Sequence, residues 1–131
     1  VILSVVYGEA VSGGYISTGM MADACYALAD AEIKVMNLPA MSRITKIPLD
    51  HLQALAKQSP VFSPGVENYL RMGHLDAVWQ GDYAAQLAAS IASLQAKSRE
   101  EIGKDLRIER GVERGGRQAA GMVVERVLAN R

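Results

Sequence analysis

The chain opens on a continuous apolar run, VILSVV at residues 1–6, which ends at Tyr7 and Gly8. A run of this kind, without alternating polar residues, is typical of a strand buried on both faces, as strands inside parallel sheets are. Such a strand needs neighbours on both of its edges, and segments that precede it in a chain normally supply some of them. We therefore expect residues 1–131 to form the C-terminal part of a larger domain.

Helical and strand-like patterns alternate along the rest of the chain, which favours an α/β domain with buried parallel strands. The 131 residues suffice for one domain at most. We expect further strands at 24–29, 32–37 and 75–79, and helices at 13–24, 38–48, 48–60, 63–73, 83–96 and 119–129. Pro39 marks the first turn of one helix, Gly73 the end of another, and Asp82 the N-cap of a third.

The composition changes at Lys97, where a tail of about 97–131 rich in both charge signs begins. The signs alternate at helical spacing, which predicts helices with a solvated charged face. A basic surface for an acidic partner is the alternative, because the tail carries a net positive charge. The formal net charge of the whole chain is zero, so we expect neither nucleic acid nor a membrane as a partner.

Cysteine and metal-ligand patterns narrow the function classes further. The single cysteine, Cys25, excludes an internal disulfide and is interpreted as a buried apolar residue, which fits a cytoplasmic protein. No His, Asp or Glu residues have metal-ligand spacing, so we predict no metal site. No apolar stretch is long enough to span a bilayer.

The segment YGEAVSGGY, residues 7–15, places Gly13 and Gly14 where the first predicted strand region gives way to a helix. The first N–H groups of a helix are free, and glycine tolerates unusual backbone angles and has no Cβ to obstruct a ligand. Three interpretations remain open for the residues alone: a plain turn, an oxyanion hole and a phosphate site. The glycine spacing matches neither of the common phosphate-binding patterns.

Residues 1–37 resemble the crotonase superfamily, in which a buried strand leads into a Gly-Gly loop, a short helix and another strand. GEAVSGG at 8–14 is similar to the Gly-Glu-x-x-Ser-Gly-Gly pattern of acyl-CoA carboxyltransferase subunits. The stretches at 20–49 and 59–73 resemble the gamma subunits of bacterial malonate decarboxylases. The resemblance implies an α/β crotonase/ClpP-like fold of ββα units, with residues 1–131 as the C-terminal part of a single domain.

The resemblance also implies a function. Such a subunit would act in a hetero-oligomer with a decarboxylase beta subunit, on a malonyl thioester carried by the prosthetic arm of an acyl carrier protein. It would bind no cofactor tightly itself. Gly13 and Gly14 would donate backbone N–H groups to the enolate, and Ser12 would shape the turn. A carboxyltransferase subunit of a biotin-dependent carboxylase and a non-catalytic assembly module are the alternatives.

Other polar residues near the loop have two interpretations each. Ser12 is a turn residue or a nucleophile, which would need a histidine base. Glu9 either braces the loop through nearby backbone or acts as an acid–base group. Tyr7, Glu9 and Tyr15 are the candidate proton donors, and Tyr15 is also a candidate for substrate binding.

More distant candidates have weaker patterns. Arg43 and Lys46, three residues apart on one predicted helix face, either bind a phosphate of the prosthetic arm or are solvated charges. His51 and His74 are interpreted as surface or packing residues, and Trp79 as part of the core.

Overall fold

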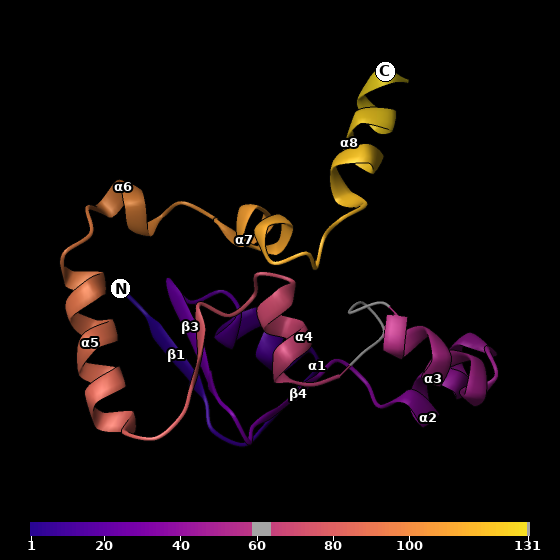
Figure 1. Ribbon diagram of the computed structural model, residues 1–131, viewed down its shortest axis with the longest axis horizontal. Coiled ribbons are helices and arrows are strands. Elements are labelled where there is room, and N and C mark those ends of the chain that lie inside the picture. The colour runs from indigo at the N-terminus through magenta and orange to yellow at the C-terminus, as the bar shows by residue number, and fades with distance from the viewer. Residues whose placement is uncertain (59–63, 131) are drawn as a thin grey trace.

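Two small parallel sheets form the centre of the computed structural model, which describes residues 1–58 and 64–130 (Figure 1). Strands β1 (Leu3–Val6), β3 (Ala24–Leu28) and β5 (Ala77–Trp79) make the first sheet in the order β1-β3-β5. Strands β2 (Glu9–Val11) and β4 (Glu32–Lys34) make the second, and all pairs are parallel. The expected α/β architecture with parallel strands is confirmed.

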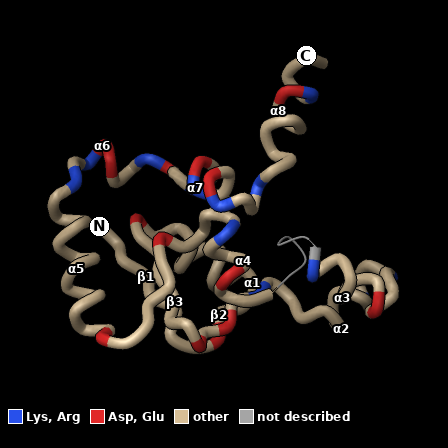
Figure 2. The backbone as a smooth tube through the Cα atoms, in the orientation of Figure 1, with Lys and Arg blue, Asp and Glu red and all other residues tan. Residues whose placement is uncertain are grey.

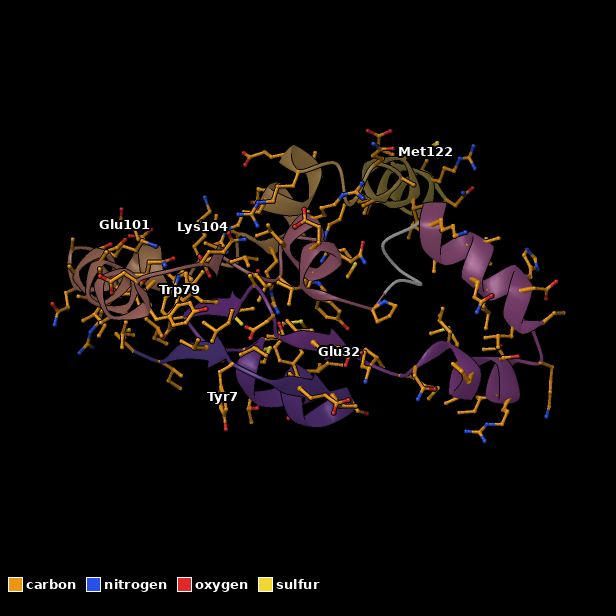
Figure 3. The ribbon with its side chains drawn as sticks, turned by 60° about the horizontal axis from the view of Figure 1, so that its bottom comes forward. Tyr7, Glu32, Trp79, Glu101, Lys104 and Met122 are labelled. Atoms are coloured by element: carbon orange, nitrogen blue, oxygen red, sulfur yellow. The ribbon has the colours of Figure 1, made fainter. Side chains whose placement is uncertain are left out.

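Apolar residues of the strands and of the helix packed on them form the core. Ala27 on β3, Ile33 on β4 and Leu75 before β5 are completely buried. Cys25 is buried among them as a free thiol, as predicted. Trp79 is also buried and stacks on Tyr26, with ring centroids 4.7 Å apart, so its assignment to the core is confirmed (Figure 3).

Strand β1 differs from the expectation of a strand buried on both faces. It forms an edge of its sheet, and of its residues only Val6 is buried within the described chain. Val1 and Ile2, which precede the strand, are exposed. The apolar run therefore contains more hydrophobic surface than the described residues cover.

The helices follow the local signals closely. Residues 12–19 form a short helix, α1 (Ser12–Gly14), that continues as the π-helical segment η1 (Tyr15–Gly19). Helix α2 (Leu38–Thr45) has Pro39 in its first turn and begins after Asn37, whose side chain accepts a hydrogen bond from the Ala40 N–H. Helix α5 (Tyr83–Gln95) begins after Asp82, whose side chain accepts from the Ala85 N–H. These helix starts are confirmed.

Two other helices complete the region before the tail. Helix α3 (Leu49–Gln58) packs against α2. Helix α4 (Val66–Arg71) ends before Gly73 as predicted, but it starts later than the expected Ser63–Pro64. Gly65 has a φ of 111° and so cannot be part of the helix, and Ser63 lies outside the described residues.

The tail forms three helices, α6 (Arg99–Ile102), α7 (Arg107–Glu113) and α8 (Ala120–Ala129). In Figure 1, α6 and α7 run back along one end of the sheet strands, and α8 extends away from the rest of the chain. Charged residues of both signs are concentrated along α6 and α7 (Figure 2). Helix α8 is exposed along almost its whole length, including Met122, Val124 and Leu128.

Arginines of the tail point into the molecule, so the prediction of a solvated charged face is wrong for α7 and the turn after it. Arg110 forms an ion pair with Asp76 at 3.0 Å. The Arg114 guanidinium donates to the carbonyls of Leu70, Leu75 and Asp76 at 2.7–3.0 Å. The free carbonyls at the C-terminal end of α4 and beyond attract such cations, because helix C-termini are electronegative.

Glycines allow this contact between the tail and α4. A Cβ on Gly73 would lie 2.2 Å from the Arg107 carbonyl oxygen, and one on Gly116 would lie 2.2 Å from the Arg71 carbonyl oxygen. The backbones of α4 and α7 therefore meet with no room for a side chain at either position.

Candidate functional site

A cavity of about 420 Å³ lies beside the Gly-Gly loop, between β1, β2 and the helix of residues 12–19. Glu9, Gly14 and Tyr15 line it, together with Tyr7 and Gly8. The structure thus brings most of the candidate residues of the loop to one cavity. Ser12 and Gly13 belong to the same loop but are not part of its lining.

The glycines of the loop do not use the unusual backbone angles that glycine tolerates. Ser12 has the left-handed conformation, with a φ of 58°, whereas Gly14 is helical, with φ −59° and ψ −48°. A Cβ placed on Gly13 or Gly14 would meet no atom within 4 Å. Neither glycine is therefore required by the backbone conformation or by packing within the described chain. The space in front of both glycines is open to a ligand.

The polar groups of the two glycines have different environments. Their carbonyls accept hydrogen bonds from side chains one turn on: the Ser17 hydroxyl donates to Gly13 at 2.7 Å, and the Thr18 hydroxyl donates to Gly14. Their N–H groups lie in the first turn of the helix, where no intrahelical acceptor exists. These N–H groups are thus available to an acceptor in front of the loop, at the positive end of the helix dipole.

Glu9 forms an ion pair with Lys34, a contact that neither of its two interpretations included. The Lys34 Nζ lies 2.5 Å from the Glu9 Oε1 and 3.0 Å from the Glu32 Oε1. The pair joins β2 to β4, directly before the loop. Lys34 is a residue that the sequence did not single out, although the alternation of Glu32, Ile33 and Lys34 places the two charges on one strand face.

Tyr15 lies with its ring in the core and its hydroxyl 3.7 Å from the Cys25 Sγ. Burial, followed by the neighbouring Cys25, raises the pKa of the Tyr15 phenol far above its ordinary value. The phenol is therefore protonated at physiological pH and contributes packing to the cavity wall. Tyr7, the other tyrosine of the segment, is 83% exposed (Figure 3).

Several candidates lie away from this cavity. Arg43 and Lys46 are exposed, and neither lines the cavity. They also do not share a helix face, because α2 ends at Thr45 and Lys46 adopts a left-handed conformation. The histidines are likewise absent from the lining, which leaves Ser12 without a histidine base there.

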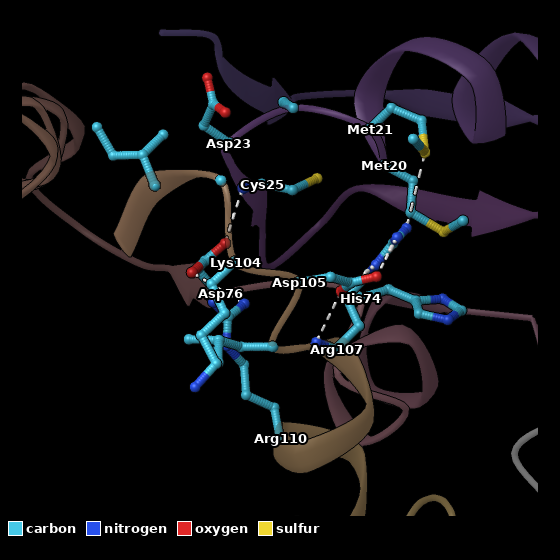
Figure 4. Close-up of a pocket in the computed structure, with 14 residues that line it drawn as sticks. Met20, Met21, Asp23, Cys25, His74, Asp76, Lys104, Asp105, Arg107 and Arg110 are labelled. Atoms are coloured by element: carbon cyan, nitrogen blue, oxygen red, sulfur yellow. Dashed lines mark hydrogen bonds and ion pairs between the residues drawn. The ribbon is translucent and has the colours of Figure 1, made fainter. Parts of the chain in front are cut away.

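A second cavity, of about 190 Å³, lies at the opposite ends of the strands, between the start of β3 and the segment from α6 to α7 (Figure 4). Two of its carboxylates are paired with arginines. Asp76 accepts a hydrogen bond from the Cys25 N–H at 2.9 Å and pairs with Arg110, and Asp105 pairs with Arg107 at 2.6 Å. Sequence reasoning missed this cluster because Asp76 is distant in the chain from Arg110.

His74 lines the second cavity and is a packing residue, as one of the two interpretations had it. Arg117 lies 3.0 Å from the His74 Nε2, and the His74 Nδ1 is buried without a hydrogen-bond partner in the described structure. Burial, together with the nearby Arg117 and Arg107, lowers the pKa of His74 from 6.5 to about 4. The folded protein therefore holds this imidazole in its neutral form.

We expect a stability loss in acid that depends on His74. Because its folded pKa lies below its unfolded value, the unfolded state takes up the proton first, and stability present above pH 6.5 falls as the pH drops to about 4. Replacing His74 by glutamine, which can still accept from Arg117, should flatten this part of the melting-temperature profile. His51→Gln, on the surface of α3, serves as the control, and identical profiles for His74→Gln and the unmodified protein would contradict the assignment.

Within residues 1–58 and 64–130, no group of three His, Cys, Asp or Glu residues has the arrangement to hold a metal ion. No helix of the described chain is long and apolar enough to cross a membrane.

Comparisons with known proteins identify relatives of the chain. The family model described as the malonate decarboxylase gamma subunit matches residues 1–131. A curated relative, the malonyl-S-ACP:biotin-protein carboxyltransferase MADD of Malonomonas rubra, is 31% identical over 132 residues, covering 94% of this chain and 45% of the relative.

Solved structures of malonate decarboxylase from Pseudomonas share the fold. One chain of a hetero-tetramer in complex with coenzyme A aligns with 98% of this chain over 52% of its own length. The TM-score is 0.69 and the sequence identity is 21%. One chain of an MdcD-MdcE hetero-dimer aligns with 98% of this chain over 49% of its own length, with a TM-score of 0.61 and 24% identity. The chain spans about half the length of these relatives.

The fold similarity confirms the expected α/β crotonase-like fold. The match of the family model over all 131 residues confirms the resemblance inferred from the Gly-Glu-x-x-Ser-Gly-Gly segment and the stretches that follow it. The chain therefore belongs to the malonate decarboxylase gamma subunit family.

Proposed function

We propose that the chain is a subunit of a decarboxylase that converts a malonyl thioester on an acyl carrier protein to the acetyl thioester and CO2. The observation that carries the proposal is the environment of Gly13 and Gly14. Both have free space where a Cβ would be, neither is needed for an unusual φ, and Gly14 faces the cavity of about 420 Å³. A loop of this kind suits a ligand atom that approaches the backbone.

The chemistry of decarboxylation matches what the loop offers. When the bond between the α-carbon and the carboxylate breaks, CO2 leaves and the electron pair passes into the thioester carbonyl, which becomes an enolate. The α-carbon of the enolate then takes up a proton, which gives the acetyl thioester. Negative charge thus grows on one oxygen. Backbone N–H groups placed in advance stabilise such an oxygen without reorganising, and each donor typically contributes about 3–4 kcal/mol to the transition state. Gly13 and Gly14 have this role in our proposal.

The other loop residues then have supporting roles. Ser12 takes the left-handed corner between β2 and the helix, which sets the direction of the N–H groups that follow. Glu9 is bound to Lys34 and braces β2. The buried Tyr15 supports the helix from below through its contact with Cys25.

The partners follow from the relatives and from the surface. The Pseudomonas structures are a hetero-tetramer and a hetero-dimer. We propose a decarboxylase beta subunit and an acyl carrier protein as partners of this chain. The exposed apolar residues of α8 and of the segment before β1 support a hetero-oligomer, because large apolar patches on a surface typically mark interfaces.

Ser12→Ala distinguishes an enolate-stabilising loop from a serine nucleophile. If backbone amides stabilise the enolate, the variant should lose only the contribution of a turn hydroxyl, about 1 kcal/mol or roughly fivefold in turnover. Loss of a nucleophile would typically reduce turnover by several orders of magnitude. The measurement is turnover of the malonyl thioester by the assembled complex. An inactive variant that is folded and assembled would contradict the role of Ser12 proposed here.

A biotin-dependent carboxyl transfer is the second candidate, favoured by the 31% identity to the carboxyltransferase of Malonomonas rubra. That reaction also releases the malonyl carboxyl group, so the same loop would serve it. Avidin separates the two: it sequesters biotin and should stop turnover only if a biotin protein accepts the carboxyl group. Undiminished CO2 release in the presence of avidin supports the direct decarboxylation that we propose.

A further inference from the structure

One face of the two-stranded sheet carries three charged side chains next to the Gly-Gly loop. Glu9 on β2 lies opposite Glu32 on β4 in the parallel register, and Lys34 lies on the same face. On the other face, Ile33 is completely buried in the core. The charged face is therefore fixed in position by the packing of the opposite face.

Lys34 is the central charge of this group. Its side chain is only 16% exposed, whereas those of Glu9 and Glu32 are 57% and 53% exposed. The Nζ contacts both carboxylates, at 2.5 Å and 3.0 Å. Contact with Glu9, and then with Glu32, raises the pKa of Lys34, so the ammonium group is charged at neutral pH. Without it, two like charges would face each other across adjacent strands, which is unfavourable.

Glu9 connects this group to the cavity, because Glu9 and Gly14 line the same space. The substrate of the proposed function carries a free carboxylate on its malonyl group. A glutamate without a partner at the wall of the cavity would repel that carboxylate, and the repulsion is only partly screened by solvent.

We propose that Lys34 is a positioning residue that determines acyl specificity: it neutralises and holds Glu9, so that the cavity accepts an acyl group with a free carboxylate. This inference rests on the proposed function, since it concerns the same cavity and the same malonyl thioester. It goes further in naming the side chain on which acceptance of the negative charge depends.

Lys34→Met tests the inference in the assembled complex. The KM for the malonyl thioester of the carrier protein should rise by about threefold to tenfold at low ionic strength, with a smaller change in kcat. Inhibition by the acetyl thioester, which lacks the carboxylate, should not change. The rise in KM should also shrink as salt is added, because the repulsion is screened.

Three further variants isolate the charge from the structure. Lys34→Arg keeps the positive charge and should keep a KM near that of the unmodified chain. The double variant Lys34→Met/Glu9→Gln removes the unpaired carboxylate and should lower the KM again. Lys97→Met, an exposed lysine after α5, is the matched control for loss of one positive charge.

Two results would overturn the inference: an unchanged KM for Lys34→Met, or equal weakening of the malonyl and acetyl thioesters, which would show a structural role alone. Failure of the proposed function itself has a different signature, because a bulky side chain at Gly14 would then leave turnover intact. Loss of turnover on blocking Gly14, combined with an unchanged KM for Lys34→Met, would refute only the role of Lys34.

Discussion

Replacing Gly14 by valine is expected to reduce turnover of the malonyl thioester by at least about a hundredfold, the effect typical of losing one oxyanion donor. The valine side chain would occupy the space in front of the loop, where the thioester oxygen must approach the N–H groups. The fold should be preserved, because Gly14 has helical angles and a Cβ there meets no atom within 4 Å. Valine is also no worse a helix residue than glycine.

The measurement combines turnover of the assembled complex with its melting temperature and its subunit composition. Gly14→Ala should give an intermediate loss, since one methyl group fills less of the space. Ala84→Val, at an exposed position in the first turn of α5, is the control for introducing valine into a helix. Normal turnover of a folded and assembled Gly14→Val complex would favour a non-catalytic assembly module.

Gly73→Ala is expected to lower the free energy of unfolding by about 3–5 kcal/mol, the sum of overpacking and backbone strain. The new Cβ would lie 2.2 Å from the Arg107 carbonyl oxygen and 2.7 Å from the Gly111 nitrogen. Both neighbours are backbone atoms, which cannot rotate away. The φ of 84° at Gly73 adds strain for any residue with a Cβ. The contact between α4 and α7 should therefore open.

Urea denaturation of the purified protein measures this loss, and Gly115→Ala provides the control. Gly115 also has a positive φ, of 72°, but the nearest atom to its Cβ would be 3.7 Å away, on the Gln118 side chain. The control variant should thus show only the cost of the left-handed conformation, about 1 kcal/mol. Equal losses for the two variants would show that the close backbone contact contributes nothing.

Much of the fold could be predicted from the sequence because its signals are local. The apolar runs predicted β1 and β3, and their alternation with helical segments predicted parallel pairing. The cap residues Asn37 and Asp82 bond to N–H groups three residues on, so neighbouring residues alone decide where those helices start. The predicted start of α4 was wrong. Pro64 indicated a helix start, but the backbone conformation of Gly65 is not helical, so the helix begins only at Val66.

The candidate site was predictable only in part. The position of Gly13 and Gly14 between a strand and a helix could be predicted from their place in the chain. The free N–H groups could be predicted as well, because they lie in the first turn of a helix. The left-handed residue of the loop proved to be Ser12, which the pattern of residues did not indicate. Met20 packs against the core, whereas Met21 is exposed within the described chain.

By itself, the sequence determined the family, most of the strands and helices but not β2, and the glycine loop at the start of a helix, since each of these depends on residues close together in the chain. Only the tertiary structure decided that Lys34 forms an ion pair with Glu9, that Arg114 donates to carbonyls at the C-terminal end of α4 and beyond, and that His74 is held neutral. These contacts join residues 25 to 44 positions apart in the chain, as in the pairs Glu9–Lys34 and Leu70–Arg114. In the sequence, these charged and polar residues are indistinguishable from ordinary surface residues. The groups that they contact come close to them only when distant segments of the chain pack together.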